Sequence, residues 1–127
     1  MSQSKVLPEP IGAEYQYLMA ARHGRVLLLA SQIPKTDPRT IFAAGRCGED
    51  IDMDTACESA RLAAGQVLAW LEAERLPDET VDRVLRLQVY VAVAEGGFDI
   101  SSVADAASET IIARLGPSGR HPRTVLG

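Results

Sequence analysis

Cationic side chains gather near the end of the sequence, in the segment "GPSGRHPRTVLG" at residues 116–127. Arg120, His121 and Arg123 follow a turn rich in glycine and proline, and the residues after them resemble the start of a strand. An arginine placed there can project over a sheet edge and hold a carboxylate through two parallel hydrogen bonds. The alternative is an ordinary solvated side chain, because most arginines are exposed. The segment therefore predicts a candidate anion anchor at Arg123 and leaves this alternative open.

Stronger catalytic motifs are absent from the sequence. It contains no HExxH, CxxC, GxxxxGK[ST] or GxSxG pattern, and no spacing sets a nucleophile beside a base. Cys47 and Cys57 have neither the number nor the spacing of a disulfide framework or zinc site. The acidic run "EDIDMD" at 49–54 lacks the glycine and terminal glutamate of a calcium loop, which favours a helix entry. The strong sequence signals for a metal site, a phosphate loop and a hydrolase nucleophile are therefore absent.

Length and charge exclude several classes of protein. A chain of 127 residues with 46% hydrophobic and 24% charged residues is typical of one globular domain, spanning 1–127. The net charge of −4 argues against a nucleic-acid partner held by bulk positive charge. The first twelve residues lack an apolar signal region, and no apolar run approaches the length of a membrane span. These features predict a cytoplasmic protein without a membrane partner.

The apolar pattern predicts several strands. Residues 24–34 form a continuous apolar run closed by a proline, which favours a strand covered on both faces. Residues 41–48 favour a short strand or an extended edge. Residues 81–93 alternate between an apolar face and a face carrying Arg86, Gln88 and Tyr90, which meets either solvent, a partner subunit or a ligand. The segment "HPRTVLG" begins a last strand.

Two helices are predicted between these strands. Residues 54–75 carry apolar side chains at three- and four-residue steps, after acidic and capping residues. Residues 98–116 repeat the pattern, with Ser101 or Ser102 as the N-cap. The expected buried stripe of this second helix is Val103, Ala107, Ile111 or Ile112, and Leu115. The resulting order predicts an α+β fold, a sheet with two helices packed on one face.

Several segments, taken in order, resemble one known family. They are "ASQIP" at 30–34, the long stretch "GEDIDMDTACESARLAAGQVLAWLEAERLPDETVDRVLRLQVYV", and the closing "GRHPRT". Together they resemble the RidA/YjgF family of reactive-intermediate deaminases, also labelled L-PSP endoribonucleases, over roughly residues 10–127. The segment "DAASETIIARLGPSGRHPRTVLG" is similar to the branch with a GRHAR-type segment, whose fold is described as chorismate-mutase-like.

The resemblance implies a fold, an assembly and a reaction. The implied fold is a mixed β-sheet with two helices on one face, assembled as a homotrimer with ligand clefts between subunits. The implied reaction is hydrolysis of an enamine or imine to a ketone and ammonia without a cofactor. Arg123 matches the arginine that grips the substrate carboxylate, and the family's next strand, with its water-positioning glutamate, would follow "TVLG". We therefore expect this last strand to be missing from residues 1–127.

The resemblance also suggests residues that line the cleft. The family's serine falls on Ala30, with Ser31 where a glycine is usual, and Asp105 stands where the family usually has asparagine. The remaining candidates are Tyr15 or Tyr17 as the N-terminal tyrosine, with Arg120 and His121 shaping the turn beside Arg123. Three functions remain open: deamination, binding of a small carboxylate without turnover, and, with least support, endoribonuclease activity.

Overall fold

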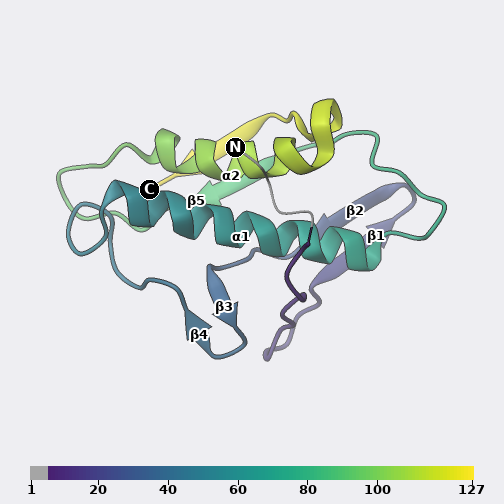
Figure 1. Ribbon diagram of the computed structural model, residues 1–127, viewed down its shortest axis with the longest axis horizontal. Coiled ribbons are helices and arrows are strands. Elements are labelled where there is room, and N and C mark those ends of the chain that lie inside the picture. Colours follow the sequence, from purple (N-terminus) through teal and green to yellow (C-terminus); the bar gives the residue numbers. More distant parts are fainter. Residues whose placement is uncertain (1–5) are drawn as a thin grey trace.

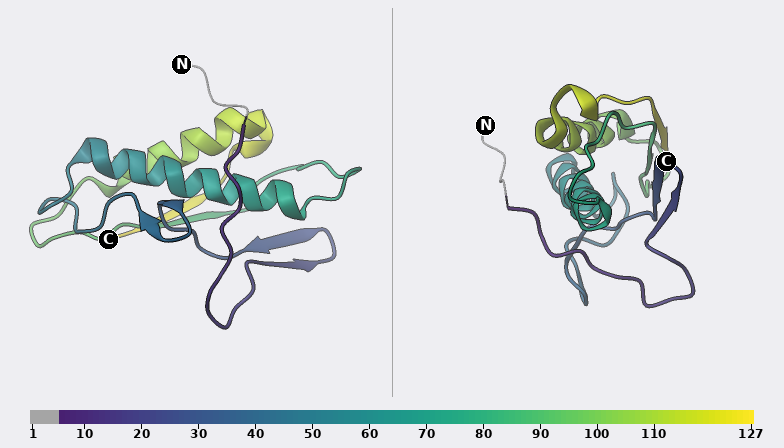
Figure 2. Two further views of the ribbon diagram at one scale, coloured as in Figure 1. Left: turned by 60° about the horizontal axis from the view of Figure 1, so that its bottom comes forward. Right: turned by 90° about the vertical axis from the view of Figure 1, so that its right-hand side faces the viewer.

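The structure is a computed structural model that describes residues 6–127. Its elements, in chain order, are β1 (Ala20–His23), β2 (Val26–Leu29), β3 (Lys35–Asp37), β4 (Thr40–Ile41), α1 (Met53–Glu74), β5 (Leu87–Tyr90), α2 (Ile100–Leu115), the 3₁₀ turn η1 (Gly116–Gly119) and β6 (Arg123–Leu126). The two α-helices lie side by side, and β5 and the yellow β6 lie behind them in Figure 1. The end-on view in Figure 2 places both helices on the same side of these strands, as predicted.

The strands pair two by two. Within residues 6–127 they form three two-stranded sheets: antiparallel β1–β2, antiparallel β3–β4 and parallel β5–β6. An isolated parallel bridge joins Cys47 to Val93 and extends the β5–β6 layer. Parallel strands need a crossover connection, and α2 supplies it between β5 and β6. The predicted mixed sheet is therefore observed as small sheets beside two helices.

The prediction of a strand covered on both faces at 24–34 was wrong. Strand β2 spans only Val26–Leu29, and its side chains alternate between exposed and half-buried. Leu28 is 63% exposed. Gly24, with a φ of 58°, turns the chain between β1 and β2, so the apolar run forms one arm of a hairpin rather than a central strand. A run of leucines cannot by itself distinguish these two cases.

The predicted strand at 81–93 is shorter in the structure and spans Leu87–Tyr90. Leu85, which the alternation assigned to the buried face, precedes the strand and is 57% exposed. Within the strand the alternation is correct, because Leu87 and Val89 are half-buried while Tyr90 is exposed. The covered face of β5 is therefore the face toward the helices.

Both helices begin at an aspartate. Asp52 caps α1 by accepting a hydrogen bond from the backbone N–H of Thr55, at 2.8 Å. Asp99 caps α2 in the same way, with the N–H of Ser102 at 3.1 Å. The expected serine cap of α2 was therefore wrong: Asp99 precedes the helix, and its carboxylate reaches the unsatisfied N–H groups of the first turn. The acidic run at 49–54 does serve as a helix entry.

These caps predict a dependence of stability on acid. Hydrogen bonds from the Thr55 side chain and backbone lower the pKa of Asp52 below the ordinary 3.8, and those from Ser102 lower the pKa of Asp99. A lowered folded-state pKa stabilises the fold above the unfolded value, and this contribution is lost as pH falls through the folded value. We expect the double variant Asp52→Asn/Asp99→Asn, which keeps an acceptor but does not titrate, to lose less stability below about pH 4.

Urea unfolding at a series of pH values from 6 to 2 checks this expectation. The wild type should show the steeper decline at the acid end, and the double variant the shallower one. Parallel declines for the two proteins would show that the caps do not contribute to the acid sensitivity.

Core packing between the helices and β5–β6 uses small side chains. One cluster centres on Cys47, Ala56, Val91 and Val103, and the other on Ala64, Ala107 and Ile111. Ile111 is 3% exposed, which resolves the choice between Ile111 and Ile112 left open by the sequence. Buried alanines on both helices let the two helix backbones approach closely.

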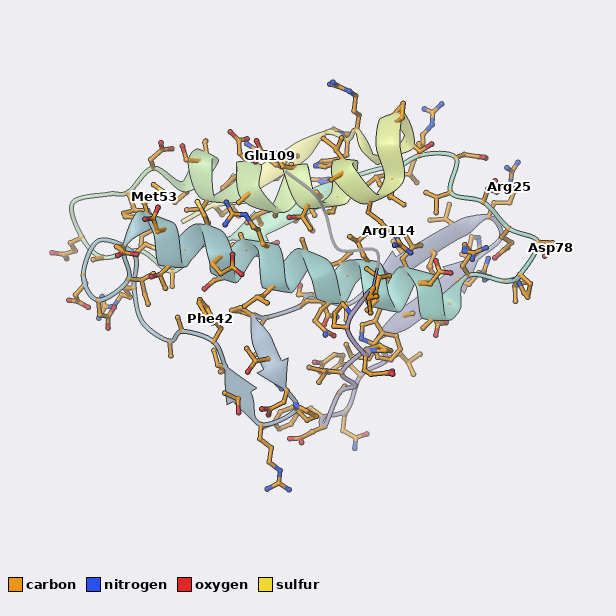
Figure 3. All side chains as sticks on the ribbon, viewed as in Figure 1. Arg25, Phe42, Met53, Asp78, Glu109 and Arg114 are labelled. Carbon is orange, nitrogen blue, oxygen red and sulfur yellow. The ribbon has the colours of Figure 1, made fainter. Side chains whose placement is uncertain are left out.

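Polar contacts join the N-terminal part of the chain to α1 and to the loop that follows it. The buried Gln66 side chain accepts from the N–H of Ile11 and donates to the carbonyl of Glu9. The β1–β2 hairpin contacts the loop after α1, where Arg22 pairs with Glu79 and Arg25 with Asp82, at 3.0 and 2.7 Å. Figure 3 shows Arg25 at this end of the molecule, near the loop that carries Asp78.

No helix within residues 6–127 is both long and apolar enough to cross a membrane.

Candidate anion site at the start of β6

The start of β6 lies beneath α2. The strands β5 and β6 pair so that Leu87 is beside Arg123 and Val89 is beside Val125. Lateral neighbours in a sheet share a face, and the face of Leu87 and Val89 is covered by the helices. Arg123 is therefore on the helix-covered face of the sheet. The sequence alone did not predict that this arginine would be partly buried or would contact a helix.

Arg123 contacts two side chains of α2. Its Nη1 donates to Oδ1 of Asp105 at 2.8 Å and to Oγ of Ser108 at 3.1 Å. Asp105 and Ser108 are three residues apart, so the helix presents them on the same side. The guanidinium is thus held at one nitrogen by a carboxylate and a hydroxyl.

His121 extends this arrangement into a chain of hydrogen bonds. Its Nε2 lies 2.9 Å from Ser108 Oγ, and its Nδ1 lies 2.5 Å from the carbonyl oxygen of Gly119. A carbonyl oxygen can only accept, so Nδ1 carries a proton. In the neutral ring Nε2 then accepts the Ser108 hydroxyl proton, while Ser108 Oγ accepts from Arg123. Ser108 Oγ and both ring nitrogens of His121 each have a partner of the required kind.

Gly119 brings its carbonyl to His121 because it packs directly on α2. A Cβ added to Gly119 would lie 2.9 Å from Cα of Ile112 and 3.0 Å from the carbonyl oxygen of Ile111. Both of these atoms belong to the backbone, so neither can move aside cheaply. The glycine of "GPSG" therefore lets the turn seat itself against the helix and fixes the position of the histidine.

The burial of the cluster is graded. Ser108 is 8% exposed, the Arg123 side chain 22%, and the Asp105 side chain 61%. An ion pair this exposed on one side contributes at most about 1 kcal/mol to stability. Among residues 6–127, neither Nε nor Nη2 of Arg123 has a hydrogen-bond partner. The cluster therefore fixes the guanidinium while leaving its Nε–Nη2 edge available for a bidentate contact.

Ser108 is the central residue of the chain, and its removal has a predictable cost. In Ser108→Ala the Nε2 of His121 and one N–H of Arg123 lose their shared partner in a half-buried place. We expect a decrease of about 1–2 kcal/mol in the free energy of unfolding in urea. The matched control is Ser101→Ala, an exposed serine of the same helix, which should change stability by less than about 0.5 kcal/mol. Equal effects of the two substitutions would contradict the role given to Ser108.

The predicted site residues divide into two groups. Arg123, Asp105 and His121 come together, as described, and Arg120 lies beside them, exposed, lining a hollow with Leu85 and Pro122. The other candidates lie elsewhere in the chain and are exposed: Tyr15 at 78%, Tyr17 at 54%, and Ser31. No hydrogen bond within the described chain joins these three to the Arg123 cluster.

Sequence reasoning missed Ser108. The signal that could have found it is a polar residue on the expected buried stripe, since it directly follows Ala107 and lies three residues before Ile111. Cys47 offers no rival site: burial, followed by the nearby Asp50 charge, raises the pKa of its thiol, which disfavours the reactive thiolate. No group of three or more metal-ligating side chains is assembled within residues 6–127.

Comparison with known proteins supports the fold. No protein-family model matches the sequence. A protein of Trypanosoma cruzi, TCP17, is 29% identical over 122 residues, covering 95% of this chain and 76% of that protein. A Shewanella oneidensis crystal structure, provisionally assigned as an endoribonuclease, superposes with a TM-score of 0.87 at 23% identity and covers 95% of this chain and 80% of that one.

A second crystal structure, of the Agrobacterium tumefaciens protein Atu1372 of unknown function, has a TM-score of 0.80 at 29% identity. It covers 89% of this chain and 73% of that one. The element order, the two helices on one side of the strands, and these superpositions agree with the arrangement implied by the sequence resemblance. The chain therefore has the RidA/YjgF fold.

Proposed function

We propose that this protein binds a small carboxylate-bearing imine or enamine at Arg123 and hydrolyses it to a ketone and ammonia. One observation supports this proposal above the others. The guanidinium of Arg123 is held at Nη1 by Asp105 and Ser108, and its Nε–Nη2 edge has no partner among residues 6–127. A fixed guanidinium with a free edge is well suited to grip a planar carboxylate.

The proposed reaction needs no oxidant or reductant. The oxygen of a water molecule bonds to the imine carbon, the π electrons of the C=N bond move to nitrogen, and one water proton passes to that nitrogen, giving a carbinolamine that keeps the second proton as its hydroxyl. A proton passes from oxygen to nitrogen, the C–N bond breaks, the C=O bond forms, and ammonia leaves. Because the imine is already reactive, holding its carboxylate so that one face meets water would supply most of the acceleration.

The proposal includes a homotrimer with the site at the subunit interface. Assembly, as distinct from the place of the site, is supported by exposed apolar side chains on the face of β5–β6 opposite the one that carries Arg123, and on the β1–β2 hairpin. Tyr90 and its strand partner Leu126 are 62% and 51% exposed, and Leu28 on the hairpin is 63% exposed. Large apolar side chains exposed side by side, as Tyr90 and Leu126 are on paired strands, favour a surface covered by a partner. In a trimer, Tyr15 or Tyr17 and Ser31 of a neighbouring copy would complete the cleft around Arg123.

The test is ammonia release from a 2-imino acid generated in place by an amino-acid oxidase. We expect the purified protein to accelerate ammonia release above the spontaneous rate, and sedimentation to give the mass of a trimer. A rate equal to that with no added protein, at every protein concentration, would overturn the deaminase proposal.

A second candidate is carboxylate binding without turnover. The observation that favours it concerns Asp105, whose carboxylate is bonded to the guanidinium of Arg123. A carboxylate held in this way is not placed to position a water molecule for hydrolysis. A carboxylate ligand that raises the melting temperature without being consumed would favour this second function over the first.

Endoribonuclease activity has the least support. The net charge of −4 gives the chain no overall attraction for a phosphate backbone, on which RNA affinity largely depends. The sequence also has few aromatic side chains on which bases could stack: three tyrosines, two phenylalanines and one tryptophan.

A further inference from the structure

We propose that a hollow beside the 3₁₀ turn η1 is a second anion site, which takes the phosphate group of a small phosphate monoester whose remainder is apolar. The hollow lies between the loop after α1 and the turn before β6. Its lining is Asp82, Arg83, Val84, Leu85, Pro117, Arg120 and Pro122, and we call it the Arg83–Arg120 hollow. The proposal does not depend on the function given to Arg123, which is not among these lining residues.

Backbone hydrogen bonds hold the two walls of the hollow side by side. The N–H of Val84 donates to the carbonyl of Ser118 at 3.0 Å, and the N–H of Leu87 donates to the carbonyl of Pro122 at 3.1 Å. Figure 1 shows the loop after α1 passing η1 before it enters β5. One wall is fixed further by Gly119, which is buried against α2. The two arginines are therefore carried by segments whose spacing is set by the fold.

The two arginines of this hollow have no side-chain partner within residues 6–127. Neither Arg83 nor Arg120 forms a side-chain hydrogen bond or ion pair there, and both are exposed. Asp82, the acid on the lining, is bonded to Arg25 at 2.7 Å. The hollow thus carries two uncompensated positive charges in a chain whose net charge is −4. Its complement is a group with about two negative charges, which a phosphate monoester provides near pH 7.

Arginine is well suited to this contact. Its planar guanidinium can donate two parallel hydrogen bonds to the oxygens of one phosphate group. A single exposed arginine is usually just solvated. Arg83 and Arg120 differ from that case because both line one hollow, from two segments, and neither is used within the described chain.

The rest of the lining indicates what kind of molecule carries the phosphate. Leu85 is 57% exposed, and Pro117 and Pro122 are exposed as well. Their side chains offer apolar surface without hydrogen-bond donors, which favours an aromatic or aliphatic group over a sugar or a second charge. The hollow has a volume of about 420 Å³, and small-molecule sites commonly have about 300–1,000 Å³. A small ester with one phosphate and one apolar group therefore complements both parts of the hollow.

The probes are phenyl phosphate, inorganic phosphate and phenylacetate, titrated by calorimetry into the full chain. Phenyl phosphate carries both the dianion and the ring, inorganic phosphate carries only the dianion, and phenylacetate carries a ring with a single charge. The variants are Arg83→Ala, Arg120→Ala and Leu85→Ala. The matched control is Arg39→Ala, which removes an exposed arginine that also lacks a side-chain partner among the described residues, in the turn between β3 and β4. Salt at about 0.15 M screens charges more than about 8 Å away.

We expect phenyl phosphate to be the tightest of the three ligands for the wild type. Each of Arg83→Ala and Arg120→Ala should weaken both phosphate ligands about fivefold, the effect of losing one partly exposed ion pair. The control Arg39→Ala should leave them unchanged. The variant Leu85→Ala should weaken phenyl phosphate but not inorganic phosphate, because only the ester reaches the apolar wall. Replacing Arg123 with alanine should leave the affinity for both phosphate ligands at the wild-type value.

Several results would overturn the proposal. If the wild type binds neither phosphate ligand, or if Arg83→Ala and Arg120→Ala bind as tightly as Arg39→Ala, the hollow is not a phosphate site. If Arg123→Ala abolishes phosphate binding, the phosphate occupies the Arg123 site instead. An unchanged affinity of Leu85→Ala for phenyl phosphate would contradict the apolar group assigned to the ligand. Because both arginines of the hollow are exposed, their variants should unfold in urea as the wild type does, so a lost affinity is not a lost fold.

Discussion

Replacing Arg123 with alanine should weaken the binding of a small carboxylate roughly 10- to 150-fold and remove a matching share of any imine hydrolysis. The loss corresponds to about 1.5–3 kcal/mol, the usual contribution of hydrogen bonds to a charged group. The lower end applies if the bound carboxylate stays wet, since the Arg123 side chain is 22% exposed in the single chain. The upper end applies if a neighbouring subunit excludes water from the cleft.

The measurement is a titration of pyruvate and alanine alongside the ammonia assay, for the wild type and the variant. Arg61→Ala is the control, because Arg61 is an arginine in an exposed ion pair with Glu58 on α1. A further variant, Arg123→Lys, keeps the charge but loses the fork, and it should fall between the other two. Wild-type binding by Arg123→Ala would eliminate Arg123 as the anchor.

The fold itself should tolerate this substitution. The ion pair with Asp105 is partly exposed and contributes at most about 1 kcal/mol. Urea unfolding of Arg123→Ala therefore separates a lost ligand contact from a lost fold. A decrease in unfolding free energy much larger than about 1 kcal/mol would indicate that the arginine holds α2 in place. In that case the ligand contact is tested with Arg123→Lys, which keeps the positive charge.

The largest effect on stability is expected for Ile111→Ala. Ile111 is 3% exposed and lies in the cluster with Ala64 and Ala107, where α2 meets α1. Truncating a buried isoleucine to alanine costs about 2–5 kcal/mol, from lost burial and from the cavity that remains. A domain of this size has a total stability of about 5–15 kcal/mol, so the variant should be near the limit of stable folding.

The adjacent isoleucine is a matched control. Ile112 has the same side chain on the same helix but is only half-buried. Part of its surface already meets solvent, so Ile112→Ala should cost clearly less, roughly 1–2 kcal/mol. Urea unfolding measures both variants. Equal losses, or a larger loss at Ile112, would contradict the packing of α2 described above.

These two substitutions also connect the core to the site. Ile111 lies three residues after Ser108, and the buried stripe of α2 determines how that helix sits over β6. A looser helix should widen the distance from Ser108 to His121 and Arg123. Where Ile111→Ala still folds, we therefore expect weaker carboxylate binding as well, although the Ile111 side chain packs in the core with Ala64 and Ala107.

Features that depend on local sequence were predictable. Helix periodicity located α1 and α2 to within about two residues at each end. The alternation around β5 and the strand beginning near Arg123 were also correct, because a two-residue period follows directly from strand geometry. The resemblance of the sequence to the RidA/YjgF family predicted the fold, which the superpositions confirm.

Other features depended on packing and were not predictable. The apolar run at 24–34 is a hairpin arm because Gly24 turns the chain, and local hydrophobicity does not record what covers a strand. The choice between Ile111 and Ile112 required the rotation of α2 against α1. The aspartate cap of α2 was missed because Asp99 and both nearby serines are all favourable capping residues.

The sequence by itself determined that Arg123 begins a strand after a glycine- and proline-rich turn, and its family resemblance suggested a carboxylate anchor. Only the tertiary structure decided that Arg123 lies under α2, paired with Asp105 and joined through Ser108 to His121. The physical reason is separation along the chain: these contacts join residues 13 to 18 positions apart. They exist because helix packing and strand register, each set by the whole core, bring one face of α2 over the first residue of β6.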